Sequence, residues 1–137
     1  MLELVIFTGL PGSGKSTYYR EHYEATHVHV SKDLMARSRD DVQQRQIETA
    51  LAAGRSVVVD NTNPSRETRA PLIAFGRRFG AKIIGIFFDV DARVCIMRNR
   101  GREGRARVPE VAIFTTRKKL QPPALDEGFD ELHVITA

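Results

Sequence analysis

The chain has 137 residues, of which 42% are hydrophobic and 28% are charged, as is ordinary for a soluble globular protein. Lysine and arginine exceed aspartate and glutamate by four, which is weak support for a polyanionic partner. The sequence holds no apolar run of membrane-spanning length and no signal-peptide pattern, and its single cysteine, Cys95, excludes an internal disulfide and a cysteine metal site. We therefore expect one domain over residues 1–137, in the cytoplasm and without a membrane partner.

Apolar, strand-like runs alternate with helical patterns along the chain. The runs are Leu2–Thr8, His27–Val30, Ser56–Asp60, Ala81–Asp89 and Glu131–Ile135. Alternation of this kind predicts an α/β fold, in which a parallel sheet lies between helices on both faces.

A phosphate-binding loop follows the first run. Residues 9–16 read G-L-P-G-S-G-K-S, which matches the pattern G-x-x-x-x-G-K-S, and a helix is expected after them. In this context the backbone N–H groups point inward and the helix N-terminus adds partial positive charge, so a chance glycine-rich turn is a poor alternative. Lys15 would reach the β- and γ-phosphates of ATP, and the Ser16 hydroxyl would bind Mg²⁺. The expected nucleotide-binding residues of the loop are Gly9, Pro11, Gly12, Ser13, Gly14, Lys15, Ser16 and Thr17.

Asp33 comes three residues after the second run. The C-terminal ends of parallel strands meet at one edge of a sheet, and the phosphate-binding loop leaves the first strand at the same edge. The carboxylate of Asp33 could therefore accept the proton of an attacking hydroxyl, although its position fits a turn-capping residue equally well. His27 and His29 alternate with valines, and we interpret them as outer strand residues without a catalytic role.

Asp60 ends the third run, directly after three valines. An apolar strand that ends in aspartate is the second signature of phosphate-loop proteins, in which the carboxylate supports Mg²⁺ directly or through water. The alternative is a turn-forming aspartate. Because the phosphate-binding loop is present, we favour the metal interpretation and predict that Ser16 and Asp60 share the metal site.

Three further helices are predicted. The first lies between the second and third runs, with Ser38 as a plausible cap and Gly54 as its stop. The second begins at Asn63-Pro64, with Asn63 as its cap, and Pro71 should produce a kink or a late start. The third runs from about Pro109 to Leu120. The residues of these helices expected in the core are Ile47, Ala50, Leu51, Leu72, Phe75, Phe79, Val111, Ile113, Phe114 and Leu120.

Residues 98–107 carry five arginines and two glycines. This composition predicts a mobile arginine lid over about residues 98–108 that closes on a triphosphate and neutralises its charge. Arg98 and Arg102 are four residues apart, so they would share a face if the preceding helix continues. A solvated basic loop and an electrostatic contact with nucleic acid are the alternatives.

These segments together resemble the kinase domain of polynucleotide 5′-hydroxyl kinases, over essentially the whole chain. The resemblance is greatest to the kinase half of the animal enzyme that joins a phosphatase to a kinase, and no phosphatase segment is present here. It is carried by the phosphate-binding loop, V-S-K-D at 30–33, V-D-N-T-N-P at 59–64, the arginine lid, R-K at 117–118 and P-A-L-D-E-G-F at 123–129. The resemblance implies a P-loop kinase fold with strand order 2-3-1-4-5, and transfer of the γ-phosphate of ATP to the 5′-hydroxyl end of DNA or RNA.

The resemblance also implies roles for single residues. Asp33 falls on the general base of the family, while Arg98 and Arg102 fall on its paired lid arginines, of which Arg102 would contact the transferred phosphate. The family segment Asn-Arg-Asp is Ser-Lys-Asp here. The bacteriophage enzyme has an arginine three residues after its base; that place holds Ala36 here, and the adjacent Arg37 could substitute.

Two other functions are compatible with the same residues. Small-molecule and toxin kinases share the loop, the acid and the lid, so the acceptor could be the hydroxyl of a small molecule or a nucleoside. A nucleotide-binding module without transfer activity is the third hypothesis. The intact lysine, both acids and the lid argue against it.

Overall fold

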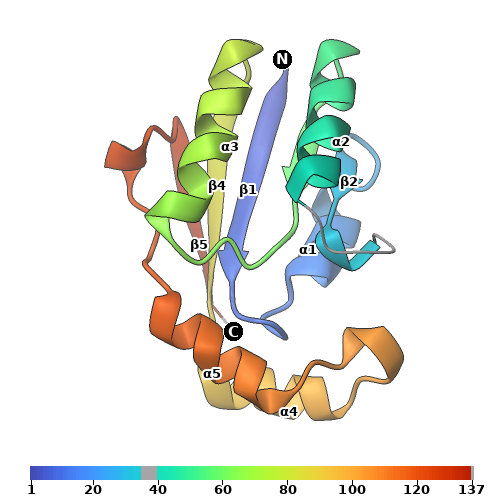
Figure 1. Cartoon of the computed structure of the whole chain (residues 1–137), viewed down its shortest axis with the longest axis vertical. Coiled ribbons are helices and arrows are strands. Elements are labelled where there is room, and N and C mark those ends of the chain that lie inside the picture. The colour runs from blue at the N-terminus through green and yellow to red at the C-terminus, as the bar shows by residue number, and fades with distance from the viewer. Residues whose placement is uncertain (35–39, 137) are drawn as a thin grey trace.

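The computed structural model describes residues 1–34 and 40–136. Figure 1 shows a sheet with helices packed against both of its faces. Within the described residues five strands pair in parallel, in the order β2-β3-β1-β4-β5. The α/β class, the five-stranded parallel sheet and its strand order are therefore confirmed. The strands are β1 (Glu3–Gly9), β2 (Val28–Val30), β3 (Val57–Val59), β4 (Lys82–Asp89) and β5 (Glu131–Thr136).

The helices occupy three places around the sheet. Helices α2 and α3 pack on one face and α1 packs on the other, whereas α4 and α5 lie beyond the end at which β1 enters the phosphate-binding loop (Figure 1). None of the helices in the described ranges is long and apolar enough to cross a membrane. The α-helices are α1 (Lys15–His22), α2 (Asp40–Ala52), α3 (Arg66–Arg78), α4 (Ala92–Arg100) and α5 (Glu110–Lys119), and the short 3₁₀ helices are η1 (Lys32–Leu34), η2 (Gly104–Ala106) and η3 (Leu125–Glu127).

Strand β1 is the centre of the core because both of its faces are buried. Leu4 and Ile6 pack in the cluster that contains α2 and α3, whereas Val5 and Phe7 pack with Tyr19 of α1 on the opposite face. This alternation is the period of two expected for a strand that is covered on both sides. The sheet edge at the end of β1 is therefore held rigidly from two directions.

Most of the predicted helix core residues are confirmed. Buried or packed against the α2–α3 side of the sheet are Ile47, Ala50, Leu51, Leu72, Phe75 and Phe79. Cys95 is a buried free cysteine. The proposed cap Ser38 lies outside the described residues.

Helix α5 departs from the prediction because it packs beyond the sheet and not on one of its faces. Its Ile113 is fully buried against Leu10 and Cys95, in a cluster that joins α4 and α5 to the phosphate-binding loop. Val111 and Phe114 lie elsewhere on the helix and are 68% and 43% exposed. The expectation of a core position is therefore wrong for these two side chains.

Helix α3 begins at Arg66, so the predicted start at Asn63-Pro64 is wrong. Its cap is Ser65, whose Oγ accepts a hydrogen bond of 3.1 Å from the Thr68 backbone N–H. Asn63 has a different function in the fold. It adopts a positive φ of 41°, and its buried Nδ2 donates to the Phe7 carbonyl of β1 over 2.7 Å. The helix continues through Pro71 to Arg78.

A buried ion pair ties this part of the chain to the C-terminal segment. Arg69 Nε and Nη2 donate to the two carboxylate oxygens of Glu127 over 2.8 and 3.0 Å, and Arg69 Nη1 donates to the Asn63 carbonyl over 3.0 Å. The Arg69 side chain is fully buried and that of Glu127 is 4% exposed. Burial acts to raise the pKa of Glu127, but the hydrogen bonds from Arg69 and from the Ala124 N–H outweigh it and hold that pKa below its ordinary value.

Replacing Glu127 by glutamine should destabilise the fold by about 3–5 kcal/mol at neutral pH, because the substitution leaves the Arg69 charge buried without its partner. The wild-type protein should lose the same contribution as the pH falls below the ordinary pKa of glutamate, about 4.5, and through the lower pKa of the folded state. Urea unfolding at several pH values measures both effects. Asp126→Asn is the matched control, because its pair with Arg66 is exposed and should contribute less than about 1 kcal/mol. Equal, small losses in both variants would contradict a structural role for the buried pair.

Candidate active site

The phosphate-binding loop connects β1 to α1 at the C-terminal edge of the sheet. Gly12 and Gly14 have φ angles of 83° and 99°, which favour glycine. A Cβ atom on Gly12 would also lie 2.7 Å from the Cys95 carbonyl oxygen of α4. The loop therefore needs glycine at position 12 both for its turn and for its close packing against α4.

Lys15 is buried inside this loop. Its Nζ donates hydrogen bonds to the carbonyl oxygens of Leu10 and Gly9 over 2.7 and 3.1 Å. Burial lowers the pKa of the Lys15 ammonium to about 8, against the opposite effect of the nearby Asp60 carboxylate. A phosphate group bound in the loop would favour the charged form of the lysine, so the loop and an anionic ligand stabilise one another.

Ser16 and Asp60 meet as the sequence predicts. The Ser16 hydroxyl donates to Asp60 Oδ2 over 2.8 Å, and the Asp60 side chain is almost fully buried. A hydroxyl and a carboxylate are oxygen donors of the kind that Mg²⁺ prefers. In the described parts of the chain no group of three or more His, Cys, Asp or Glu side chains could hold a metal ion. The pair could hold a magnesium ion only together with further ligands, such as phosphate and water.

His29 completes the surroundings of Asp60, although it was predicted to be an outer strand residue without a catalytic role. Its Nε2 lies 2.7 Å from Asp60 Oδ2, the same oxygen that accepts the Ser16 hydroxyl. The imidazole ring stacks on Tyr19 of α1, with ring centres 3.9 Å apart and an angle of 13° between the planes. The only sequence signal was its place one residue before the end of a strand. The position of His29 beside Asp60 depends on the pairing of β2 with β3, which the local sequence does not show.

Asp33 lies in η1 and faces a first hollow of about 230 Å³ at the sheet edge. Lys15, Ser16, Asp60 and Arg102 line the same hollow, so the structure brings the two predicted acids and two predicted cations together. The catalytic role of Asp33 remains a prediction. Ala36 and Arg37 fall outside the described residues.

Asn61 positions the backbone that leads to Asp33. Its Oδ1 accepts a hydrogen bond of 2.9 Å from the Lys32 N–H, and its Nδ2 donates to Gln43 of α2. The Asp33 N–H in turn donates to Ser31 Oγ over 3.3 Å. Asn61 therefore links the loop after β3 to the loop after β2.

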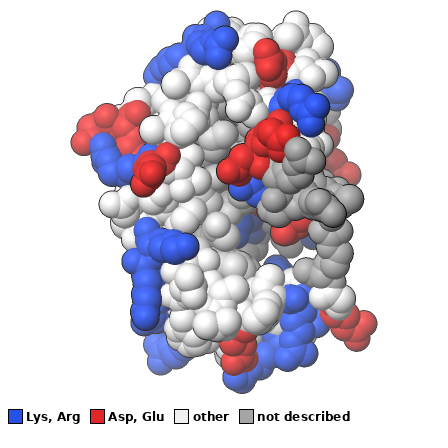
Figure 2. Space-filling model, viewed as in Figure 1, with Lys and Arg blue, Asp and Glu red and all other residues white. Residues whose placement is uncertain are grey.

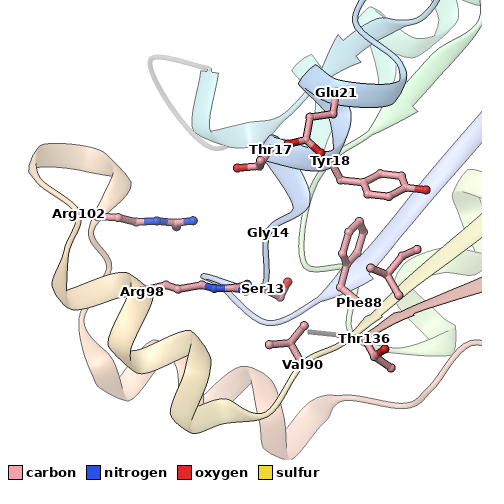
Figure 3. A pocket seen from close by; sticks show the side chains of 11 residues that line it. Ser13, Gly14, Thr17, Tyr18, Glu21, Phe88, Val90, Arg98, Arg102 and Thr136 are labelled. Carbon is pink, nitrogen blue, oxygen red and sulfur yellow. The ribbon is translucent and has the colours of Figure 1, made fainter.

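A second hollow of about 440 Å³ lies on the other side of the loop and is drawn in Figure 3. Arg98 and Arg102 point toward the loop from one side, and Tyr18 and Phe88 lie across from them (Figure 3). Arg98 Nη1 is 3.5 Å from the Gly12 carbonyl oxygen. Gly14 and Arg102 line both hollows, so this arginine stands where the two spaces meet.

The arginine lid differs in detail from its prediction. Helix α4 ends at Arg100, so Arg98 and Arg102 reach the loop without sharing a helix face. Arg100 pairs with Glu110 over 2.6 Å. The base of the lid is closed by the buried Asn99, which exchanges two hydrogen bonds, of 2.7 and 2.8 Å, with the backbone of Val108. Nothing in the sequence marked Asn99, because its partner is nine residues away across the lid.

Comparison with known proteins gives three findings about this architecture. The model of the AAA domain family matches residues 4–123. The bifunctional polynucleotide phosphatase/kinase of Schizosaccharomyces pombe is 28% identical over 137 residues, which cover 97% of this chain and 33% of that relative. The chain thus spans about a third of the length of this curated relative.

Solved structures give the third finding. A sugar kinase from Janibacter sp. HTCC2649 superposes with a TM-score of 0.71 at 19% identity, over 99% of this chain and 86% of that chain. A fungal RNA kinase superposes with a TM-score of 0.68 at 19% identity, over 99% of this chain and 38% of that chain. At these identities the likeness shows the fold alone, and that fold is the P-loop kinase fold.

The contact between His29 and Asp60 leads to a testable expectation. His29→Ala should raise the Mg²⁺ concentration that supports half-maximal nucleotide binding by about tenfold or more, because the Asp60 carboxylate loses a partner that orients it. Binding of a fluorescent ATP analogue during a Mg²⁺ titration measures this directly. His27→Ala is the matched control, since His27 contacts Glu3, which is not among the site residues. If both variants titrate as the wild type does, His29 has no positioning role.

Proposed function

Since the chain belongs to the AAA domain family, we propose that it is an ATP-dependent kinase that phosphorylates the 5′-hydroxyl end of a DNA or RNA strand. One observation carries the proposal. Asp33, Lys15, Ser16, Asp60 and Arg102 line one hollow of about 230 Å³, so a proton acceptor, phosphate-binding groups and a metal-binding pair stand around the same small space.

The donor nucleotide occupies both hollows in this proposal. Lys15 and the N–H groups of the loop bind the β- and γ-phosphates. The nucleoside lies in the second hollow, where Tyr18 and Phe88 supply apolar surface opposite the guanidinium of Arg98. Arg102 then lies near the phosphate that is transferred, because it lines both hollows.

Ser16 and Asp60 would hold Mg²⁺ in the proposed site, and His29 fixes the orientation of the Asp60 carboxylate. The ion, when bound, neutralises phosphate charge and helps to align the triphosphate for displacement. The Asp60 side chain is buried, and its Oδ2 accepts the Ser16 hydroxyl.

The transfer itself uses Asp33 and Arg102. The acceptor hydroxyl oxygen forms a bond to the γ-phosphorus, the bond from that phosphorus to the bridging oxygen of ADP breaks, and ADP leaves. The Asp33 carboxylate takes the hydroxyl proton, and the Arg102 guanidinium neutralises charge on the transferred group. Asp33 is exposed, so an acceptor can reach it from solvent.

A strand end is favoured as the acceptor by the name of the Schizosaccharomyces pombe relative and by the sequence resemblance given above. A second acceptor class has an observation of its own. A third hollow of about 490 Å³, next to Lys32 and Asn63, lies between α2 and α3 and carries the carboxylates of Asp40 and Glu67. Such a space suits a neutral hydroxyl compound better than a polyanion, and a sugar kinase shares the fold.

The test of the proposed function is phosphate transfer from ATP to an oligonucleotide with a 5′-hydroxyl end. Asp33→Asn should lower kcat by roughly two to four orders of magnitude while nucleotide binding stays near wild type, because only the proton acceptor is lost. Lys15→Met, as the contrasting variant, should lose nucleotide binding as well.

Two outcomes would overturn parts of this proposal. Near-normal turnover by Asp33→Asn would show that Asp33 is not the base. Phosphorylation of sugars or nucleosides with no product from any oligonucleotide would replace the strand end by the second acceptor class.

A further inference from the structure

Helix α5 presents a face that the proposed mechanism leaves unused. Val111 and Phe114 on this face are 68% and 43% exposed, although the same helix buries Ile113 completely. The guanidinium of Arg117 lies over the Phe114 ring, 5.8 Å from its centre. Lys118 follows on the exposed surface of the same helix. An exposed aromatic ring can stack with a flat, electron-rich group, and the cation above the ring can attract negative charge next to that group.

The positive charge of the chain is concentrated around this helix. Residues 98–119 hold eight lysines and arginines against two glutamates, a net charge of +6, whereas the whole chain carries +4, so the remaining residues carry −2. Figure 2 shows blue groups on both sides of a white surface over α5. One of the two glutamates, Glu110, is already paired with Arg100. Among the described residues no carboxylate forms an ion pair with Arg117, Lys118 or Lys119.

This face begins close in the chain to the candidate active site. Val108 lines the first hollow together with Asp33 and Arg102, and α5 begins two residues later. Val111, Phe114 and Lys118 follow at spacings of three, three and four residues, which place them along one side of a helix. The eight residues from Val111 to Lys118 span about 10 Å at the helical rise. That length matches about three nucleotides at the spacing of a stacked strand.

We propose that this face of α5, which we call the α5 platform (Val111, Phe114, Arg117 and Lys118), binds the nucleotides that follow the 5′ end of the acceptor strand. A base stacks on Phe114, and Arg117 and Lys118 bind the phosphates on either side of it. The proposal rests on the proposed function, because the strand reaches the platform from the first hollow. Stacking does not depend on base identity, so the platform takes single strands without sequence preference.

The charge distribution explains why the strand leaves over α5. The third hollow between α2 and α3, which shares Lys32 with the first hollow, presents the carboxylates of Asp40 and Glu67, and Lys32 is paired with Asp40. Phosphates are repelled there and attracted along α5. A patch of two exposed apolar side chains set among cations is small for a protein interface.

The experiment compares a 5′-hydroxyl dinucleotide with a single-stranded 12-mer of mixed sequence as acceptors for the full chain. Phe114→Ala should raise the KM for the 12-mer about tenfold, while kcat and the KM for ATP stay unchanged. The KM for the dinucleotide should change little, because so short an acceptor barely reaches the platform. Lys118→Ala should reduce the slope of log KM against log salt by about 0.7 for the 12-mer, as one phosphate contact is lost.

Val134→Ala and Arg55→Ala are the matched controls, since both side chains are exposed and belong to neither the site nor the platform. Their KM values should equal those of the wild type. If the wild type phosphorylates both oligonucleotides and Phe114→Ala leaves both KM values unchanged, the platform is wrong and the proposed function stands. If the wild type phosphorylates no oligonucleotide, the proposed function fails and the platform fails with it.

One further outcome separates a protein partner from a strand. Sedimentation of the wild type and of Phe114→Ala would detect a self-association that depends on this ring. A change in association with no change in the KM for the 12-mer would make the α5 platform a protein interface and would overturn the proposal.

Discussion

The parallel alignment of β1 with β3 is the constraint on which the rest of the site depends. Val59 pairs with Ile6, and the next residue, Asp60, therefore follows beside Phe7, on the face of the sheet that α1 covers. Two further contacts hold this alignment beyond the ends of the strands. The Gly9 N–H donates to the Thr62 carbonyl over 3.1 Å, and the Asn63 amide donates to the Phe7 carbonyl over 2.7 Å. A slip of one residue would point Asp60 to the opposite side of the strand and separate it from Ser16.

Positive charge is concentrated in residues 98–119, whereas two carboxylates, Asp33 and Asp60, lie at the sheet edge. Asp60 is buried and receives hydrogen bonds from Ser16 and His29 at a single oxygen, while Asp33 stands exposed at the rim of the same hollow. Under the proposed mechanism these environments suit different tasks. A fixed carboxylate can hold a metal ion, and an accessible one can take a proton from an incoming alcohol.

Local patterns predicted the strands, the phosphate-binding loop and the meeting of Ser16 with Asp60, because each depends on neighbours in sequence or on the common edge of a parallel sheet. They failed where the partner is distant in the chain. His29 gains its importance from Asp60, thirty-one residues away, and Asn63 was assigned to a helix cap because its bond to Phe7 is invisible in the sequence. Val111 and Phe114 were placed in the core because helical periodicity cannot tell whether a helix lies on a sheet or beyond its end.

The proposed reaction is one direct displacement at the sheet edge, with donor and acceptor held in line. The stereochemistry at phosphorus tests this most directly. A γ-thiophosphate of ATP that is chiral through oxygen isotopes would be reacted with a 5′-hydroxyl oligonucleotide, and the configuration of the product would be determined. The account predicts inversion, as expected for a single in-line transfer. Retention of configuration would require two successive displacements and a phosphorylated enzyme, which would contradict Asp33 as a proton acceptor in a single step.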